Sequence, residues 1–168
     1  ALPVFAEDTL VPGDFDTIQE AIDAIASGSS TADTIIVSRA TYSENITLIS
    51  DITLRGEETA RTFLQDDSAD SPVIIANGVA NVTLRNFTFI DSAKAIEITN
   101  SINITITNNV FDVTSNCNGV EVFDDSTVDV LNNTFYDNST AVIRTSALTD
   151  IKNNIFSDND RAISSDGV

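Results

Sequence analysis

The chain has 168 residues, of which 26 are acidic, 8 are basic and none is histidine, so its formal net charge is −18. A surface this acidic repels nucleic-acid phosphates and anionic membrane surfaces, and neither is expected as a partner. No stretch approaches the length of a membrane span, and 42% apolar residues suffice for one domain with a buried core. The single cysteine, Cys117, cannot form an intrachain disulfide and has no histidine to activate it as a nucleophile.

Residues 1–13 are expected to form a leader segment that precedes the folded domain. Residues 1–6 resemble the end of an export signal peptide, with the small residues Val4 and Ala6 before the cleavage point. The sequence therefore predicts an exported protein, located outside the cell or at the cell surface.

Residues 14–30 are predicted to form a capping segment with an amphipathic helix from about Asp16 to Ala26. Asp16 or Thr17 provides the N-cap, and Gln19 or Glu20 completes a capping box. The apolar stripe of this helix consists of Ile18, Ala21, Ile22 and Ile25. Such a helix is expected to cover the first coil of a solenoid, whose apolar cross-section and strand edges would otherwise be exposed.

Residues 31–168 repeat a pattern that ends in phenylalanine. Four segments align, at 84–89, 106–111, 130–135 and 151–156, and their last residues are Phe89, Phe111, Phe135 and Phe156. Successive repeats are therefore 22, 24 and 21 residues long. A period in this range is typical of a solenoid, whose units stack to bury a common core.

Each repeat contains three short strand-like elements. Alternating apolar and polar residues mark the first set at 82–84, 104–106 and 128–130; a second set lies at 73–75, 96–98 and 120–122, and the phenylalanine pairs form the third. A leucine-rich repeat would need a leucine signature and a helical segment, whereas these repeats are rich in Asn, Thr and Ile. The pattern predicts an all-β fold, a right-handed parallel β-helix of about five to six coils.

Asparagine recurs at the same point of each repeat. Identical residues on stacked parallel strands lie about 4.8 Å apart, so their side-chain amides can form a hydrogen-bonded ladder. The ladder is predicted at an inward corner and consists of Asn86, Asn108, Asn132 and Asn153, with Asn109, Asn133 and Asn154 beside it. Of the glycosylation sequons in the chain, those of Asn45 and Asn138 are predicted to lie in loops.

The opening of the chain resembles a known superfamily. The residues that carry the resemblance are FDTIQEAID at 15–23, IIV at 35–37, ATYSEN at 40–45 and ITLRG at 52–56. They are similar to the opening of the pectin-lyase-like superfamily of right-handed β-helices, and most of all to the amino-terminal part of pectin methylesterases and of secreted β-helix repeat proteins. The resemblance implies the β-helix fold for nearly the whole chain, whereas the same opening precedes unrelated chemistries.

Most catalytic residues that this resemblance implies are missing. Pectin methylesterases are expected to carry an Asp-Phe-Ile-Phe-Gly-like strand and a later Gly-Arg-Pro-Trp-like segment; the chain has no tryptophan, and LQDD at 64–67 is only a faint echo. Polygalacturonase-like chemistry implies a His-Gly pair, which a chain without histidine lacks. Pectate-lyase-like chemistry, with acidic Ca²⁺ ligands and an arginine base, is the mechanism that the composition leaves open.

One group of acids has the arrangement that such chemistry requires. Glu97 and Glu121 are predicted on the outward side of successive strands, about one strand spacing apart. Arg144 is the candidate catalytic base, and Lys94 and Arg161 are expected near the same edge. The candidate Ca²⁺ ligands are Glu97, Glu121, Asp124 and Asp125. The alternative is an ordinary solvated face, because columns of like charge also arise from repetition alone.

Two further outward columns are explained without a function. Arg55 and Arg85 share a column, and the nearby acids Asp51, Glu57 and Glu58 are expected to neutralise them. A column of threonines, Thr53, Thr83 and Thr105, is interrupted by Asp129, and threonine is a good strand residue in any case.

Two functions remain open from the sequence. The first is a non-catalytic exported module that binds a polysaccharide or cell-surface glycan, or forms part of an adhesive protein; the regular coils and the incomplete catalytic set favour it. The second is a Ca²⁺-dependent lyase or epimerase acting on an acidic polysaccharide, with residues 57–72 as the insertion that would wall a sugar chain. The chain is also expected to be a fragment of a longer protein, or to have its last coil covered by a second copy in an end-to-end homodimer.

Overall fold

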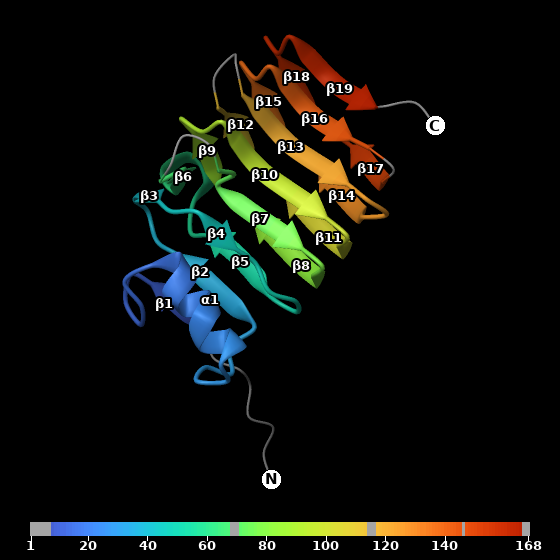
Figure 1. Ribbon diagram of the computed structural model, residues 1–168. Coiled ribbons are helices and arrows are strands. Elements are labelled where there is room, and N and C mark those ends of the chain that lie inside the picture. Colours follow the sequence, from blue (N-terminus) through green and yellow to red (C-terminus); the bar gives the residue numbers. More distant parts are fainter. Residues whose placement is uncertain (1–7, 68–70, 114–116, 146, 166–168) are drawn as a thin grey trace.

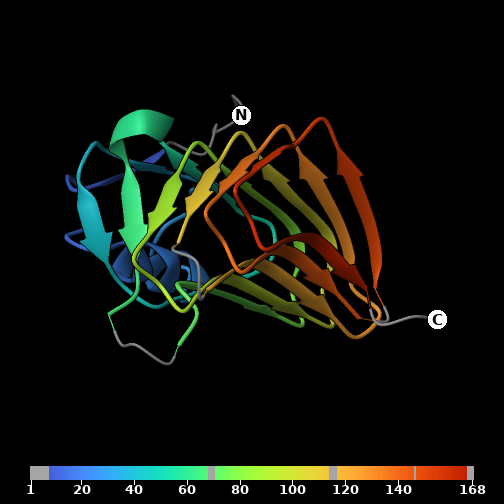
Figure 2. The same cartoon turned by 90° about the horizontal axis from the view of Figure 1, so that it is seen from above.

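The chain folds into a three-sided solenoid of parallel strands. The computed structural model describes residues 8–67, 71–113, 117–145 and 147–165. Figure 1 shows the coils stacked along one axis, with the helix at the amino-terminal end and the last coil at the opposite end. In the view from above, the sheets surround a common interior (Figure 2).

Three sheets run the length of the solenoid, and each full coil contributes one strand to each sheet, with β1 as an additional strand of the first sheet. Sheet A consists of β1 (Thr9–Val11), β2 (Thr34–Val37), β5 (Thr53–Gly56), β8 (Ala80–Arg85), β11 (Ile102–Thr107), β14 (Thr127–Leu131) and β17 (Leu148–Lys152). Sheet B consists of β3 (Thr41–Ser43), β6 (Phe63–Gln65), β9 (Thr88–Ile90), β12 (Val110–Asp112), β15 (Thr134–Tyr136) and β18 (Ile155–Ser157). Sheet C consists of β4 (Ile46–Thr47), β7 (Ile74–Asn77), β10 (Lys94–Thr99), β13 (Asn118–Phe123), β16 (Thr140–Arg144) and β19 (Arg161–Ser165).

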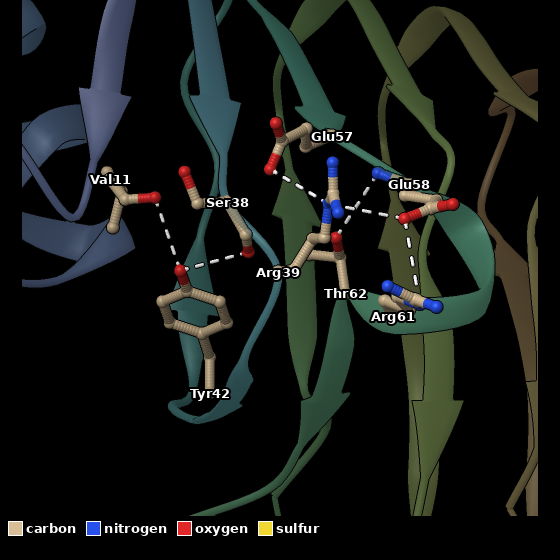
Figure 3. Close-up of polar contacts among 8 residues, drawn as sticks. All are labelled: Val11, Ser38, Arg39, Tyr42, Glu57, Glu58, Arg61 and Thr62. Carbon is tan, nitrogen blue, oxygen red and sulfur yellow. Dashed lines mark hydrogen bonds and ion pairs between the residues drawn. The ribbon is translucent and has the colours of Figure 1, made fainter.

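The solenoid begins earlier in the chain than the sequence predicts. Strand β1, which falls in the expected leader, pairs in parallel with β2 and adds a strand to sheet A. The Tyr42 hydroxyl lies 3.2 and 3.1 Å from the carbonyl oxygens of Val11 and Ser38, which ties β1 to the first full coil (Figure 3). The described residues therefore make about seven turns, slightly more than the five to six predicted.

The interior is filled by the apolar residues that alternate along each strand. In sheet A, Val82, Ile104 and Val128 share one register and are buried. In sheet B, the repeated phenylalanines stack, with ring centroids 4.8 Å apart for Phe89 and Phe111, 4.6 Å for Phe111 and Phe135, and 5.2 Å for Phe135 and Phe156. The phenylalanine that defines the sequence period thus forms a continuous column in the core.

An asparagine ladder is present, but it is displaced by one residue from the prediction. The backbone N–H of Phe87 donates to Asn109 Oδ1 at 2.9 Å, that of Asn109 to Asn133 Oδ1 at 2.9 Å, and that of Asn133 to Asn154 Oδ1 at 2.8 Å. The Nδ2 groups of the same three asparagines donate to the carbonyls of Leu84, Ile106 and Val130. The ladder therefore joins successive coils at the corner between sheets A and B.

The four asparagines predicted to form the ladder have a different role. Asn86, Asn108, Asn132 and Asn153 have φ angles of 65°, 57°, 56° and 57°. This left-handed conformation, which asparagine tolerates better than most residues, turns the chain from sheet A toward sheet B and places the next residue on the inner side. Asn108, Asn132 and Asn153 are accordingly exposed, and the prediction of an inward ladder at these positions was wrong.

A second ladder occupies the corner between sheets B and C. Asn138 is fully buried, and its backbone N–H and Nδ2 donate to Asn159 Oδ1 at 3.0 and 2.7 Å. Asn138 lies in the loop between β15 and β16, as predicted, but its side chain points into the interior. Asn45 is partly buried, and its Nδ2 donates to the Pro72 carbonyl at 2.9 Å.

The predicted helix is present as α1 (Ile18–Ala26), with Thr17 as its N-cap. Thr17 Oγ1 accepts from the Glu20 N–H and Glu20 Oε2 accepts from the Thr17 N–H, both at 3.1 Å, which forms the capping box. Glu44 accepts from the N–H groups of Ile18 and Gln19, also at 3.1 Å. The helix packs on β1, β2 and β4, and within the described residues no helix is long and apolar enough to cross a membrane.

Candidate functional site

Sheet C carries the pair of glutamates predicted from the sequence. Glu97 of β10 and Glu121 of β13 are register partners on adjacent strands. Lys94 Nζ lies 2.9 Å from Glu97 Oε2 and 3.3 Å from Glu121 Oε2, and Asn118 Nδ2 donates to Glu121 Oε1 at 2.7 Å. The two carboxylates therefore share a single lysine of their own strand pair.

This cluster is partly withdrawn from solvent. The Glu121 side chain is 6% exposed, whereas the side chains of Glu97 and Lys94 are 30% and 37% exposed. The hydrogen bond to Glu97 raises the pKa of Lys94 above its usual value, and the charge of Glu121 adds to the shift although burial opposes it. The ammonium group stays charged at neutral pH, so the cluster has the character of a structural ion-pair network.

The two aspartates predicted to complete a Ca²⁺ site lie at the turn after β13. Asp124 and Asp125 have φ angles of 46° and 48° and carry the chain from sheet C toward sheet A. In the described part of the chain, no three or more acidic or cysteine side chains are grouped so that they could hold a metal ion.

The candidate base does not face the glutamates. Arg144 is the register partner of Val122, one residue away from Glu121, and side chains one residue apart on a strand point to opposite faces. Arg161 on β19 lies three strands beyond Lys94 in the same sheet, because β13 and β16 lie between them. The structure therefore does not bring Arg144 and the Glu97–Glu121 pair together.

Arg144 instead lines a pocket where β16 turns into β17. The pocket has a volume of about 410 Å³. Its walls come from β11, β14, β17 and the end of β16, and the lining residues are Asn103, Ile104, Thr127, Val128, Asp129, Arg144, Leu148, Thr149 and Asp150.

The pocket combines charged, polar and apolar groups. Asp129 and Asp150 are register partners, and Lys152 Nζ lies 2.6 Å from Asp150 Oδ2. Arg144 makes no ion pair or hydrogen bond with any residue that the structure describes. Thr149 Oγ1 is buried and has no hydrogen-bond partner among the described residues, and Leu148 is 76% exposed. A guanidinium donor, carboxylate acceptors and an apolar rim are thus available to a ligand with several hydroxyl groups.

Sequence reasoning singled out Arg144 but not the residues around it. Asp129 was seen only as an interruption of the threonine column, and Asp150 and Leu148 were not considered. The signal was present in the same column, where threonine in β5, β8 and β11 gives way to Asp129 and Asp150 in β14 and β17. The replacement of threonine by aspartate within one column of the sheet is therefore the sequence signal that indicates the pocket.

Comparison with known proteins identifies the repeat. Residues 29–167 match a family model described as "Right handed beta helix region". No curated protein matches the chain.

Two solved structures share the fold. The crystal structure of a pectin methylesterase in complex with a hexasaccharide has a TM-score of 0.59 and 14% sequence identity, and the match covers 94% of this chain and 68% of that chain. A "putative glycosyl hydrolase" from Parabacteroides merdae has a TM-score of 0.53 and 14% identity, with 94% and 96% of the two chains covered. At such low identity these similarities show the fold alone.

Proposed function

Because this chain belongs to the right-handed β-helix family, we propose that it is an exported module that binds carbohydrate through the pocket lined by Arg144. The single observation that carries this proposal is the pocket itself. Its volume of about 410 Å³ falls within the usual range of small-ligand sites, about 300 to 1,000 Å³.

The chemistry of the pocket suits a sugar. Sugars present hydroxyl groups in a ring with apolar C–H faces; Arg144, Asp129 and Asn103 offer donors and acceptors for the hydroxyls, and Leu148 offers an apolar contact. The fold that the chain shares with a pectin methylesterase crystallised with a hexasaccharide supports a polysaccharide or cell-surface glycan as the partner.

Binding without turnover is the form of the proposal that the geometry favours. Lys94 holds Glu97 and Glu121 in an ion-pair network, and Arg144 lines a different surface. A Ca²⁺-dependent lyase would need carboxylate-bound metal and the arginine base at one place. Because the chain has 26 acidic and 8 basic residues, Ca²⁺ binding is compatible with its composition, and binding is therefore tested with and without this ion.

Pull-down on a panel of insoluble neutral and acidic polysaccharides, with and without Ca²⁺, tests the proposal. We expect retention on at least one of them by the wild type, weakened in Arg144→Gln and Asp129→Asn and unchanged in Arg61→Gln, a charge-matched control in the exposed segment η1 (Thr59–Arg61). Absorbance near the unsaturated-uronate band is followed in parallel. If this absorbance grows with the wild type and not with Glu121→Gln, the chain is a lyase and the proposal of binding without turnover is overturned. Retention on none of the polysaccharides would overturn both functions.

A further inference from the structure

Two arginines lie side by side on the outer surface of sheet A, away from the pocket. Arg55 of β5 and Arg85 of β8 are register partners on adjacent parallel strands, which run about 4.8 Å apart. Thr107 continues the column on β11. Two like charges at this spacing repel each other, so an acidic partner is expected nearby.

The acids expected to neutralise this pair are engaged elsewhere. Glu57 and Glu58 lie 3.5 and 3.2 Å from Arg39 Nε, and Glu58 also lies 3.8 Å from Arg61 Nε (Figure 3). Asp51 Oδ1 accepts from Asn81 Nδ2 at 2.7 Å. The expectation that these three acids pair with Arg55 and Arg85 was therefore wrong.

Both guanidinium groups are without a partner among the residues that the structure describes. Neither makes an ion pair or a hydrogen bond there, and Arg55 Nε is in addition buried and unsatisfied. Lys94 and Lys152, by contrast, are both paired with acids, in a chain where acids outnumber bases by 26 to 8. Two adjacent arginines that remain unpaired in such an acidic chain have the charge and the free N–H donors to bind an anion.

We propose that Arg55 and Arg85 bind a tetrahedral oxyanion, a sulfate or phosphate group. Planar guanidinium forks match the oxygens of such groups and bind them by charge-assisted hydrogen bonds. A tetrahedral anion presents oxygens to two forks at once, and a carboxylate has only two oxygens to share. The hydroxyls of Thr53 and Thr83, register partners two residues earlier on the same strands, make no hydrogen bond among the described residues and flank the site as further donors.

Titration of ¹⁵N-labelled protein with sodium sulfate, at ionic strength held constant with NaCl, tests the site. We expect saturable shifts of the Arg55 and Arg85 Nε–H resonances, and no saturable shift for Arg39 or Arg61, which are already paired. Inorganic phosphate should behave like sulfate, and acetate should bind about tenfold more weakly or worse. A monosaccharide sulfate ester distinguishes the source of the oxyanion. If the ester binds as tightly as free sulfate, the natural ligand is a sulfated glycan; if the ester does not bind, the natural ligand is the free ion.

Variants make the assignment specific. Arg85→Gln should weaken the sulfate affinity read from Arg55 by about tenfold or more, and Arg55→Lys, which keeps the charge but loses the fork, should weaken the affinity read from Arg85. Arg61→Gln, with the same loss of charge, should bind as the wild type does. Shifts that rise linearly without saturation, equal affinity in Arg85→Gln, or acetate binding as tightly as sulfate would each overturn the proposal. These readouts do not involve the pocket, so they fail or succeed independently of carbohydrate binding.

Discussion

At the scale of single residues, the two neighbouring asparagines found in each of three coils, at 108–109, 132–133 and 153–154, have different roles. Asn133 is buried and bonds to coils on both sides, whereas Asn132 is exposed and has a φ of 56°. Hydrogen bonding fixes the residue type at position 133, and backbone conformation fixes it at position 132.

Asn133→Ala is expected to lower the free energy of unfolding by about 1 to 3 kcal/mol, because the Asn109 N–H and the Ile106 carbonyl lose buried partners. Asn132→Gly, the adjacent control, should change it by less than about 0.5 kcal/mol, since glycine adopts a positive φ without strain. Equilibrium unfolding in urea measures both. Equal losses in the two variants would contradict the displaced ladder.

Lys94→Gln is expected to destabilise the fold by about 1 to 2 kcal/mol, less than the loss of a fully buried pair because Lys94 is partly exposed. Adding Glu121→Gln should recover part of this loss, and a double-mutant cycle measures the coupling. Strictly additive effects would show that Lys94 does not act through Glu121. Because the pKa of Lys94 is raised, the stabilisation is present below the usual lysine pKa and is lost as pH rises through the raised value.

Asp112 is expected to make stability depend on pH in the acidic range. Burial raises its pKa, and the charges of Asp137 and Asp91 add to the shift. The folded state therefore binds this proton more tightly than the unfolded state, so stability falls as pH rises from the usual aspartate pKa through the raised one. Asp112→Asn should be more stable than the wild type at about pH 7 and close to it at about pH 4. A difference independent of pH in urea unfolding would contradict this assignment.

At the scale of elements, the phenylalanine column links the coils through sheet B. Phe111 is fully buried between Phe89 and Phe135, whereas Phe156 is partly buried and stacks on one ring. Phe111→Ala should cost about 3 to 5 kcal/mol. Phe156→Ala should cost at most about 2 kcal/mol, because less apolar area is lost. Thermal or urea unfolding measures the loss of stability in both variants. A larger loss for Phe156→Ala than for Phe111→Ala would contradict the expectation that the middle of the column contributes more to stability than its end.

The fold was largely predictable because the repeat that builds each coil is visible in the sequence as a regular spacing of residue types. The spacing of the phenylalanines, the alternation in each strand and the capping box of α1 each follow from local chemistry and recur in the structure. Strand β1 was missed because three residues carry too little pattern. The ladder was displaced because three coils have two asparagines in succession, at 108–109, 132–133 and 153–154, and the sequence does not say which one takes the positive φ.

The site was predictable only where it follows the repeat. The Glu97–Glu121 pairing follows from the alignment of coils and is confirmed. The position of Arg144 was not predictable, because residues 141–143 are apolar throughout and hide which side chains of β16 point inward. The lining residues of the pocket lie outside the four aligned segments that end in phenylalanine, so the repeat does not specify the pocket.

At the scale of the whole molecule, the faces of the solenoid have different chemistry. Sheet B contributes the aromatic core, sheet C carries the Lys94 ion-pair network, and sheet A carries the pocket and the two unpaired arginines. Within an acidic chain of net charge −18, the outer side of sheet A thus carries two arginines, Arg55 and Arg85, that make no ion pair with any residue the structure describes.

The measurement that tests carbohydrate binding most directly is a chemical-shift map of the ¹⁵N-labelled protein, titrated with an oligosaccharide of the polysaccharide that retains it best. The account predicts saturable shifts centred on β11, β14 and β17, at Asn103, Asp129 and Leu148, with loss of the response in Arg144→Gln. Shifts centred on Glu97 and Glu121 of sheet C, or shifts unchanged by the Arg144 substitution, would contradict it.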